Sequence, residues 1–443
     1  MARIAPLQGI RYDHQKLGPA SHLVGPSRDI ISDEEKEFFW QLHQFNFCHI
    51  LHPKTPGGCD FSQSLEMLRQ WRERGHLVRD PEPSIYIYQT RFRLETDPRP
   101  RVRTGFICLL GLEDYASGVI RPHERTFPAV KERLFESIKC CQANLSPIFT
   151  FYDDPAQEVM GMLWDAAEER PVCDFQDTEG IGHKIWRLSD RQAIAEAVRH
   201  LREVPFYIAD GHHRYESCLA FWRHAREKQP GLQPPPDYTL AYAVAMQDPG
   251  LTLLPAHRLI KTINGLSALE LLTRLEASFD ITAHSLDPSS PGQLDQVMEE
   301  LAACAGETTA FCMVAEELKH VYFLRLKPEA LAGVDIHPVM EGLDVEVLSQ
   351  LVLGKGLGLG RQDRGNENLF IFESNYHKAV ERVKRQHAKI GFLVNPTRIE
   401  QVKAVADAGL YMPRKSSNFY PKVAAGLVIN QMEPPPEAGG SPA

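Results

Sequence analysis

Short apolar segments alternate with helical patterns along the chain. Strands are predicted where apolar runs have strand length, at 84–88, 105–110, 206–208, 240–246 and 391–394. Helices are predicted where apolar residues recur every three or four positions behind a capping residue. They begin at the capping box Ser32-Asp33-Glu34-Glu35, at Ser189-Asp190 and at Arg398, and the last ends before Gly409. Strands interleaved with helices predict a mixed α/β fold.

Proline-rich stretches suggest how the chain is divided. Residues 229–236 are rich in proline, which lacks an amide donor and stiffens the chain, so an exposed connector is predicted there. The sequence therefore predicts an N-terminal α/β region at 1–228 and a C-terminal α/β region at 238–430. A softer boundary at 285–291 makes residues 265–327 a candidate inserted module. Residues 431–443 are rich in Pro and Gly and are predicted to be disordered.

Composition narrows the classes of function. The chain has 443 residues, 43% of them hydrophobic and 24% charged, which is typical of a globular protein of two or three domains. A net charge of −9 disfavours a protein that coats nucleic acid or an anionic membrane. No apolar run has the length of a membrane span or a signal peptide, and nine cysteines lie scattered without a C-x-x-C motif. These features predict a cytoplasmic protein, and they leave its oligomeric state open.

The segment Asp210-Gly211-His212-His213-Arg214 has the composition of an anion site. It follows a predicted buried strand and precedes a helical pattern, so free amides meet the positive end of a helix there. Gly211 permits close approach of a ligand, Arg214 offers a planar fork to phosphate oxygens, and the two histidines can donate hydrogen bonds or move protons near neutral pH. Asp210 can orient a histidine, bind Mg²⁺ or accept a hydroxyl proton. The Walker P-loop pattern is absent from the sequence.

The same residues also have an ordinary structural interpretation. Adjacent histidines are more often surface or core residues than catalysts, and Asp-Gly is more often a turn. The position of the whole set between a buried strand and a helix favours the functional interpretation.

Further motifs accompany this segment and together carry a family resemblance. They are Pro122-His123-Glu124-Arg125-Thr126, Asn144-Leu145-Ser146-Pro147-Ile148-Phe149, Asp248-Pro249-Gly250-Leu251, Pro255-Ala256-His257-Arg258, Leu343-Asp344-Val345, Asn395-Pro396-Thr397, Met412-Pro413-Arg414-Lys415-Ser416-Ser417 and Phe419-Tyr420-Pro421-Lys422. On these motifs the chain from Ile4 to about Ile429 resembles a bacterial and archaeal family called domain of unknown function 1015. The family usually has Pro-Pro-Tyr-Asp where this chain has Gly25-Pro26-Ser27-Arg28-Asp29, so Asp29 is retained but the tyrosine is not. Arg414 stands where the family commonly has glutamine.

The box from Ala209 to Glu216 resembles that of archaeal free-serine kinases and, more distantly, the phosphate-binding boxes of the ParB and sulfiredoxin superfamily. The resemblance implies a ParB/sulfiredoxin-like core with additional α/β modules. It also implies ATP or ADP bound at the box together with Mg²⁺, for which Asp210 is the expected ligand. The implied reaction is phosphoryl transfer to or from a small hydroxylated metabolite, with serine or phosphoserine as the first expectation.

A charged cluster near Glu124 is expected to contribute to the site. Glu124, beside His123, is the first choice for a general base because the kinases resembled have a glutamate upstream of the histidine box. Lys131 and Arg133 are expected to be further phosphate ligands. The alternative for this cluster is a solvated loop that leads into a helix.

The C-terminal half offers a second set of cations. His257 and Arg258 follow a predicted strand and are expected to approach the same pocket, although a structural salt bridge is an equally good explanation of Arg258. Lys415, Ser416 and Lys422 belong to a basic, hydroxyl-bearing loop that is expected to close over an anionic ligand. The alternative is an exposed loop that only aids solubility.

A second class of function also remains open. As in partition proteins of the ParB group, the chain can be a nucleotide-binding switch that acts through a partner without metabolic turnover. A sulfiredoxin-like reductase is disfavoured, because Cys218 lies inside the helical pattern and not in an exposed electropositive position.

Overall fold

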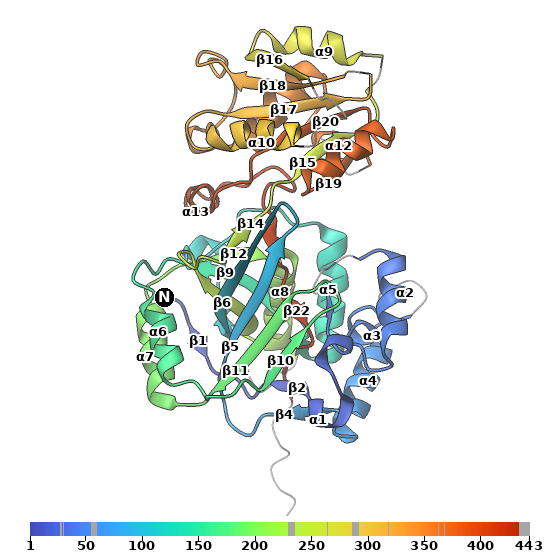
Figure 1. Cartoon of the computed structure of the whole chain (residues 1–443). Coiled ribbons are helices and arrows are strands. Elements are labelled where there is room, and N and C mark those ends of the chain that lie inside the picture. Colours follow the sequence, from blue (N-terminus) through green and yellow to red (C-terminus); the bar gives the residue numbers. More distant parts are fainter. Residues whose placement is uncertain are drawn as a thin grey trace, which may run out of the picture. The chain divides into compact units, whose positions relative to one another are not determined.

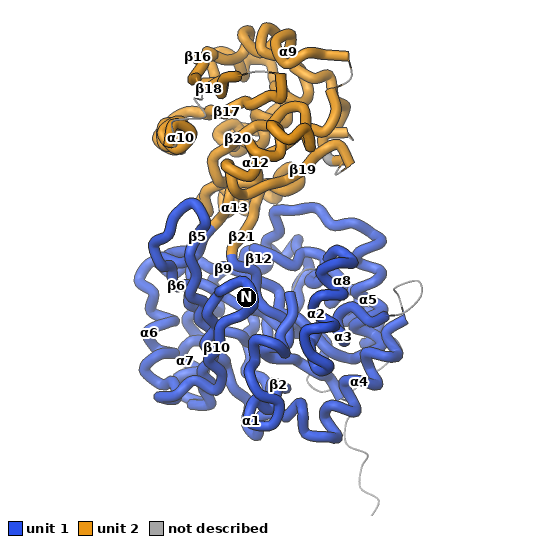
Figure 2. Tube along the Cα trace, turned by 45° about the vertical axis from the view of Figure 1, so that its right-hand side comes forward, with its two compact units in different colours: residues 1–252, 421–443 blue, residues 253–420 orange. Residues whose placement is uncertain are grey.

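The chain forms two compact units in the computed structural model, which describes residues 1–26, 29, 31–54, 60–228, 235–263, 265–285, 292–317, 319–361, 363–366 and 368–433. Unit 1 contains residues 1–252 and the chain from Pro421 onward, and unit 2 contains Leu253–Tyr420 (Figure 2). Unit 2 is therefore an insertion into the chain of unit 1. Most of the predicted connector at 229–236 and of the predicted tail at 431–443 lies outside the described residues.

A mixed sheet forms the centre of unit 1 (Figure 1). Its strand order is β10-β11-β5-β6-β13-β9-β12-β7, and β1 pairs with β6. In chain order these strands are β1 (Ile4–Ala5), β5 (Ile85–Leu94), β6 (Asp97–Gly111), β7 (Ile120–Arg121), β9 (Ile148–Tyr152), β10 (Cys173–Gln176), β11 (Gly182–Leu188), β12 (Phe206–Asp210) and β13 (Tyr238–Ala245). The predicted mixed α/β class is confirmed, whereas the ParB/sulfiredoxin-like core stays a prediction.

Strand β13 explains why the chain continues in unit 1 beyond the predicted boundary at 228–238. It pairs antiparallel with β6 on one side and parallel with β9 on the other, so it lies in the middle of the sheet. All of its residues except the first are buried. The boundary that proline suggested therefore falls inside unit 1.

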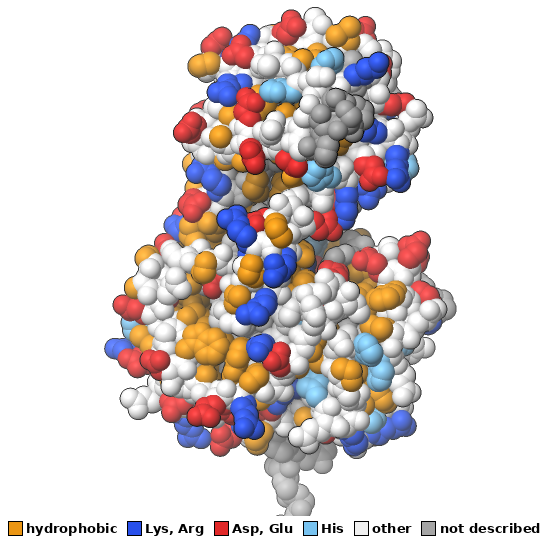
Figure 3. Space-filling view, in the orientation of Figure 1, with side chains coloured by type: hydrophobic (Ala, Val, Ile, Leu, Met, Phe, Trp, Pro, Cys, Tyr) orange, Lys and Arg blue, Asp and Glu red, His pale blue; other side chains and the backbone are white. Residues whose placement is uncertain are grey.

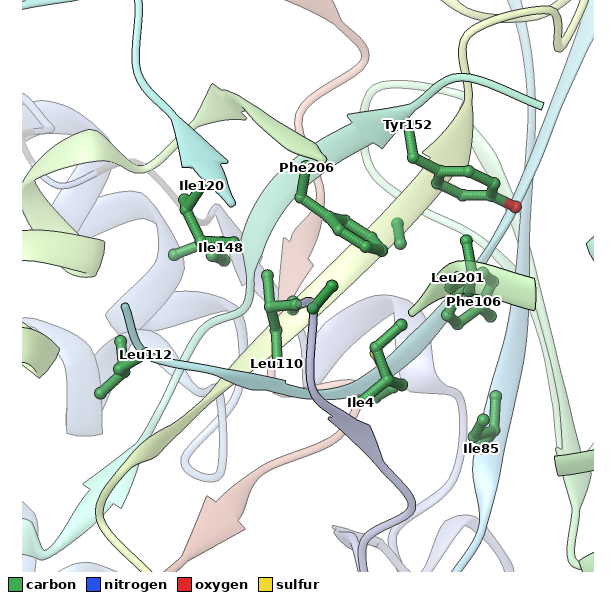
Figure 4. Close-up of a cluster of buried hydrophobic side chains, with 14 of the residues drawn as sticks. Ile4, Ile85, Phe106, Leu110, Leu112, Ile120, Ile148, Tyr152, Leu201 and Phe206 are labelled. Carbon is green, nitrogen blue, oxygen red and sulfur yellow. The ribbon is translucent and has the colours of Figure 1, made fainter. Parts of the chain in front are cut away.

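One face of this sheet packs against four helices. They are α5 (Pro128–Cys141), α6 (Glu158–Asp165), α7 (Arg191–Leu201) and α8 (His212–Lys228), and each adds buried apolar side chains to a core shared with the strands. Figure 4 shows part of this core, where Phe206 of β12 lies with Ile148 and Tyr152 of β9. Helix α7 begins as predicted, because the Asp190 carboxylate accepts from the amide of Ala193 at 2.8 Å.

The rest of unit 1 surrounds the sheet with short elements. They are α1 (His14–Leu17), α2 (Asp33–Leu42), α3 (Cys48–Leu51), α4 (Ser62–Glu73), β2 (Ile10–Tyr12), β3 (Gly25–Pro26), β4 (Leu77–Arg79) and β8 (Ala143–Asn144). The capping box predicted for α2 is confirmed, since Ser32 and Glu35 exchange hydrogen bonds of 3.0 and 3.1 Å.

After unit 2, the chain returns to unit 1 through two very short strands. β22 (Ala424–Ala425) pairs with β3, and β23 (Asn430–Gln431) pairs with β8. Buried apolar residues fill the segment that contains them. This return fixes Lys422, immediately upstream of β22, within unit 1.

Unit 2 is built on an antiparallel sheet with the strand order β16-β18-β17-β20-β15-β19. Its main elements are β15 (His257–Ile260), α9 (Ala268–Leu275), β16 (Phe279–Ser285), α10 (Gln293–Ala303), β17 (Ala310–Ala315), β18 (His320–Leu326), α11 (Asp344–Val347), β19 (Phe370–Glu373), α12 (Tyr376–Lys384), β20 (Ile390–Val394) and α13 (Ile399–Asp407). Alternate residues of β17 enter two different cores, one with α9 and the other with α10 and α12. The sheet is therefore covered on both faces.

The described residues include no helix that is long and apolar enough to cross a membrane. On the face shown in Figure 3, acidic and basic side chains are intermixed over the surfaces of both units.

Gly250 is expected to be one of the least replaceable residues of unit 1. A Cβ built on Gly250 overlaps the backbone of Val102 and Arg103 in β6, which cannot give way as a flexible side chain can. We expect Gly250→Ala to lower the free energy of unfolding by about 3 kcal/mol. The matched control is Gly161→Ala in α6, where a Cβ meets no atom within 4 Å. Urea denaturation should show the control unchanged or more stable by about 0.5–1 kcal/mol, and equal effects at the two positions would contradict the packing argument.

Candidate functional site

The predicted strand, turn and helix are present at residues 206–228. Strand β12 ends at Asp210, Gly211 makes the turn with φ +88°, and α8 begins at His212. A register shift between Ile208 and Asp210 places Asp210 opposite Phe149 of β9. Glycine is required at 211 for two reasons, since its φ is left-handed and a Cβ there lies 2.9 Å from Cζ of Arg214.

Asp210 binds two cations from different parts of the chain. Its Oδ2 accepts from Nη2 of Arg214 at 2.6 Å, and its Oδ1 accepts from Nζ of Lys422 at 2.6 Å. Burial alone raises the pKa of this carboxyl, but the charges of Lys422 and Arg214 outweigh burial and hold the pKa below its usual range. Asp210 is therefore ionised at neutral pH, and its position is fixed from both sides.

Arg214 also contacts a second carboxylate. Its Nε lies 3.0 Å from Oδ1 of Asp29, and its Nη1 donates to the carbonyl of Pro147. Burial raises the pKa of the Asp29 carboxyl, and the charge of Arg214 opposes that shift. A buried guanidinium thus joins two carboxylates that are far apart in sequence.

The two histidines of the box accept hydrogen bonds from the backbone. His212 Nε2 accepts from the amide of His123 at 3.3 Å, and His213 Nε2 accepts from the amide of Phe127 at 3.1 Å. An accepting Nε2 assigns the ring proton to Nδ1. His212 Nδ1 lies 4.0 Å from Glu124 Oε2, and His213 Nδ1 lies 3.8 Å from Oδ2 of Asp29. Each imidazole therefore accepts a hydrogen bond from a backbone amide through Nε2 and has a carboxylate near its Nδ1.

Burial keeps the imidazoles of His123 and His212 neutral near pH 7. Burial, with a smaller contribution from the charge of Lys422, lowers the pKa of His123 to about 4. Burial also lowers the pKa of His212 well below its usual value, and the neighbouring His123 ring adds to the shift. The two rings meet edge to face, with centroids 4.7 Å apart.

This pair predicts a loss of stability in acid. A buried histidine with a depressed pKa binds fewer protons folded than unfolded, so its stabilisation is complete above about pH 6.5 and is lost as the pH falls toward 4. We expect His123 alone to account for about 2 kcal/mol of lost unfolding free energy between about pH 7.5 and about pH 5.

Urea denaturation at the two pH values should show a smaller pH-dependent loss in His123→Gln than in the unchanged chain. His387→Gln, at an exposed position, is the control and should show the full loss. An undiminished loss in His123→Gln would refute the assignment.

The other residues predicted near the box lie in unit 1 but bind different partners. Lys131 donates to Glu216 Oε2 at 2.8 Å, and Arg133 donates to the carbonyls of Asp29 and Leu51 at 3.2 and 3.3 Å. Glu124 approaches the box at His212, with its Oε2 4.0 Å from Nδ1 of that ring. The roles of Lys131 and Arg133 as phosphate ligands remain predictions.

The predicted cations of the C-terminal half lie in unit 2, except Lys422. His257 is fully buried and its Nδ1 accepts from the amide of Val394 at 3.1 Å. Burial lowers the pKa of Arg258 to about 10, and its Nη2 donates to the carbonyl of Arg414 at 3.2 Å. Lys415 has φ +55°, and the buried Ser416 donates to the carbonyl of Pro413 at 2.6 Å. Arg258 thus contacts the loop that contains Lys415 and Ser416. The approach of His257 and Arg258 to the pocket of the box and the role of the loop as a clamp stay predictions.

Arg103 is a residue of the site region that the sequence did not single out. This arginine of β6 is fully buried, with its guanidinium 4.7 Å from the Phe149 ring centroid and 5.4 Å from that of Tyr242. Its Nη1 donates to the carbonyl of Pro421 at 2.8 Å, so it fixes the backbone next to Lys422. Its place in a polar, arginine-rich stretch is typical of an exposed strand end, and no local pattern signals its burial.

A small cavity adjoins Arg214. It measures about 60 Å³, and its lining is largely apolar, with Phe61, Leu134 and Ile138 among the residues, but it also includes the polar side chains of Asp29, Arg133, Asn144, Ser146 and Arg214. At roughly 10–15 Å³ for each water-sized position, it holds about four to six such positions. The cavity therefore suits a molecule of only a few non-hydrogen atoms.

The residues that the structure describes do not form a resident metal site. Among the described residues, no three His, Cys, Asp or Glu side chains are grouped to hold a metal ion. Both oxygens of Asp210 already bind cationic side chains, so the carboxylate has little negative charge left for a third cation. Mg²⁺ at Asp210 stays a prediction, and Mg²⁺ bound mainly to phosphates of a ligand is more compatible with this donor set.

Comparison with known proteins gives weak structural likenesses. "Free serine kinase in complex with AMP" has 14% identity and a TM-score of 0.32, covering 70% of this chain and 89% of that one. "Conserved hypothetical protein from Pyrococcus furiosus" has 13% identity and a TM-score of 0.31, with 70% and 93% covered. "SbnI with C-terminal truncation from Staphylococcus aureus" has 10% identity and a TM-score of 0.34, with 73% and 87% covered. At this level the likeness carries no argument about function.

No curated protein matches the chain. A family model does, over residues 4–346, which include the box, the Pro122–Thr126 motif and Leu343-Asp344-Val345. The match covers well over half of the sequence, and the chain belongs to the family described as "Protein of unknown function (DUF1015)".

Proposed function

We propose that unit 1 binds the phosphates of a nucleotide at Gly211–Arg214 and transfers a phosphoryl group to or from a small hydroxylated metabolite. Serine and phosphoserine are the first substrates to test. The observation that carries the proposal is the ion-pair set at the end of β12, where Asp210 holds Arg214 and Lys422 beside a glycine turn and a helix N-terminus. Donors of this kind, fixed before the ligand arrives, are what a phosphoryl-transfer site requires.

Lys422 is the cation best placed to contact an incoming phosphate. Its side chain is 29% exposed, whereas that of Arg214 is 9% exposed and is held by two carboxylates and a carbonyl. Lys422 can therefore turn toward a ligand while Arg214 keeps the turn in place. The first amides of α8 add neutral donors at the positive end of the helix.

Glu124 is the proposed general base. Its Oε2 lies 4.0 Å from His212, the residue directly after Gly211, whereas Asp210 is occupied by two cations. In the kinase direction, the substrate hydroxyl oxygen bonds to the terminal phosphorus, the bond from that phosphorus to the nucleotide oxygen breaks, and the hydroxyl proton passes to Glu124. As a phosphatase, the site uses water in place of the hydroxyl.

The cavity beside Arg214 is the proposed place for the small substrate. Its size fits a few non-hydrogen atoms, and Asp29, Arg133 and Arg214 supply charges of both signs for an amino acid. Asp29 is also the residue retained from the motif in which this chain lacks the usual tyrosine.

The test is phosphorus NMR of the purified full chain with Mg²⁺. ATP, ADP and phosphoserine are each supplied with and without serine, to the unchanged chain and to Lys422→Met. We expect serine-dependent nucleotide turnover, or loss of phosphoserine, that Lys422→Met reduces by about a hundredfold or more. The control is Lys184→Met, which should leave the rate unchanged. Lys184 of β11 pairs with Asp174 of β10 at 2.9 Å, and both side chains are exposed.

Nucleotide binding without turnover would reject the transferase and favour the nucleotide-dependent switch. Absence of both binding and turnover would reject a nucleotide site at the box.

A further inference from the structure

A second polar cavity lies wholly within unit 2. It measures about 310 Å³, which reaches the lower end of the range of small-molecule sites. Two motifs of the family resemblance meet in its wall, Leu343-Asp344-Val345 through Asp344 and Asn395-Pro396-Thr397 through all three residues. The proposed phosphoryl transfer uses neither motif, so this cavity requires its own explanation.

Three chain segments bring the polar groups of this cavity together. The segment before β17 contributes Thr309, the start of α11 contributes Asp344, and the segment between β20 and α13 contributes Asn395 and Arg398. Thr309 and Asn395 hydrogen-bond the Asp344 carboxyl. Asn395 is itself fixed, because its Nδ2 donates to the carbonyl of Leu301 at 2.9 Å. The carboxyl is thus held in one orientation before a ligand arrives.

Arg398 provides the opposite charge at the same cavity. A Cβ built on Gly306 lies 2.9 Å from Nη1 of Arg398, so the guanidinium lies directly against this glycine. Within the described part of the chain, no side chain accepts a hydrogen bond from that guanidinium. Its donors therefore remain available to an oxyanion.

The balance of charge favours a ligand that carries a cation as well. Glu307 and Glu341 also line the cavity, and together with Asp344 they outnumber Arg398. A simple anion would meet three carboxyl groups and one guanidinium. A molecule with both charges satisfies Asp344 and Arg398 together.

We propose that this cavity binds a small zwitterion, with its ammonium group at Asp344 and its oxyanion at Arg398. An α-amino acid is the simplest molecule of this class. The site is separate from the box of unit 1 and does not depend on the proposed phosphoryl transfer.

Binding should depend on pH in a defined direction. Burial raises the pKa of the Asp344 carboxyl to about 7, against the opposing effects of Thr309, Asn395 and the charge of Arg398. The exposed Glu307 and Glu341 face the same cavity. An ammonium group requires ionised Asp344, so affinity should rise as the pH increases through 7 and then level off.

The test is a titration of the isotope-labelled full chain followed by amide NMR. Gly306 and Gly342 line the cavity and report binding locally, while Gly211 reports the box of unit 1. The probes are L-alanine, propionate and ethylamine, because alanine has both charges but no hydroxyl to phosphorylate. We expect saturable shifts at Gly306 and Gly342 with alanine, and binding at least about tenfold weaker for either single-charge analogue.

Three variants sharpen the test. Asp344→Asn should weaken alanine binding by about tenfold or more and abolish its rise with pH. Arg398→Gln should weaken alanine but not ethylamine. Glu400→Gln, an exposed position on α13 outside the cavity wall, should change neither.

Absence of saturable shifts at Gly306 and Gly342, propionate that binds as tightly as alanine, or unchanged affinity in Asp344→Asn would each overturn the proposal. The NMR spectrum of each variant also shows whether it is folded. Failure of this site would leave the proposed reaction at the box untouched, since Gly211 and phosphate turnover are read separately.

Discussion

Arg214→Ala is expected to lower the free energy of unfolding by about 3–5 kcal/mol. The substitution removes the cation that contacts the Asp29 carboxylate, which is 17% exposed, and leaves Asp210 with Lys422 alone. It also removes the donor to the carbonyl of Pro147. Removing one partner of a buried ion pair costs more than the pair contributes, because the remaining charge stays buried. Urea denaturation at neutral pH measures the loss.

Two comparisons distinguish this effect from a general sensitivity to losing arginine. Arg199→Ala removes an arginine that is 72% exposed and pairs with Glu196 at 3.3 Å, and it should change stability by no more than about 0.5 kcal/mol. The deficit of Arg214→Ala should also shrink as the pH falls. Asp29 already has a raised pKa, and a carboxyl of this kind destabilises the fold less once it is protonated. A deficit independent of pH would show that lost packing, and not unpaired charge, is responsible.

Asp210→Asn should have the largest effect on the proposed reaction, lowering serine-dependent phosphoryl transfer by about a thousandfold. The amide keeps the shape of the side chain but loses the charge that orients Lys422 and Arg214, each 2.6 Å from its oxygens. Positioning of cations matters most in the transition state, so kcat should fall by more than KM rises.

Asp174→Asn is the matched control, since Asp174 pairs with Lys184 on exposed side chains away from the box. Its rate should equal that of the unchanged chain. A loss of less than about tenfold in Asp210→Asn would remove the ion-pair set from the mechanism and leave it with a structural role.

Local chemistry explains what the sequence predicted well. The capping residues Ser32 and Asp190 bond amides three residues away, so the signal and its structural consequence lie in the same short segment. The same holds for β12, Gly211 and α8, where an apolar run, a glycine and a helical pattern follow one another directly. Strands β5 and β6 extend beyond their apolar runs, because their pairing continues into polar, arginine-rich residues.

Contacts between distant residues explain what the sequence did not predict. Lys422 meets Asp210 across 212 residues, and Arg103 meets Pro421 across 318. β22 and β23 have two residues each and are too short to show a periodic pattern. Arg103 belongs to a strand stretch that by itself looks polar, but it lies against the rings of Phe149 and Tyr242 and bonds the returning chain at Pro421. Such pairs depend on the completed topology and leave no local signature.

The insertion of unit 2 has a consequence for how the chain is made. A ribosome delivers residues 1–252, then all of unit 2, and only afterwards Pro421, Lys422 and the partners of β3 and β8. Until then Asp210 has Arg214 but not its lysine, and Arg103 has no carbonyl to bind. Asp210 can therefore gain its second ion pair only after the whole of unit 2 has been synthesised.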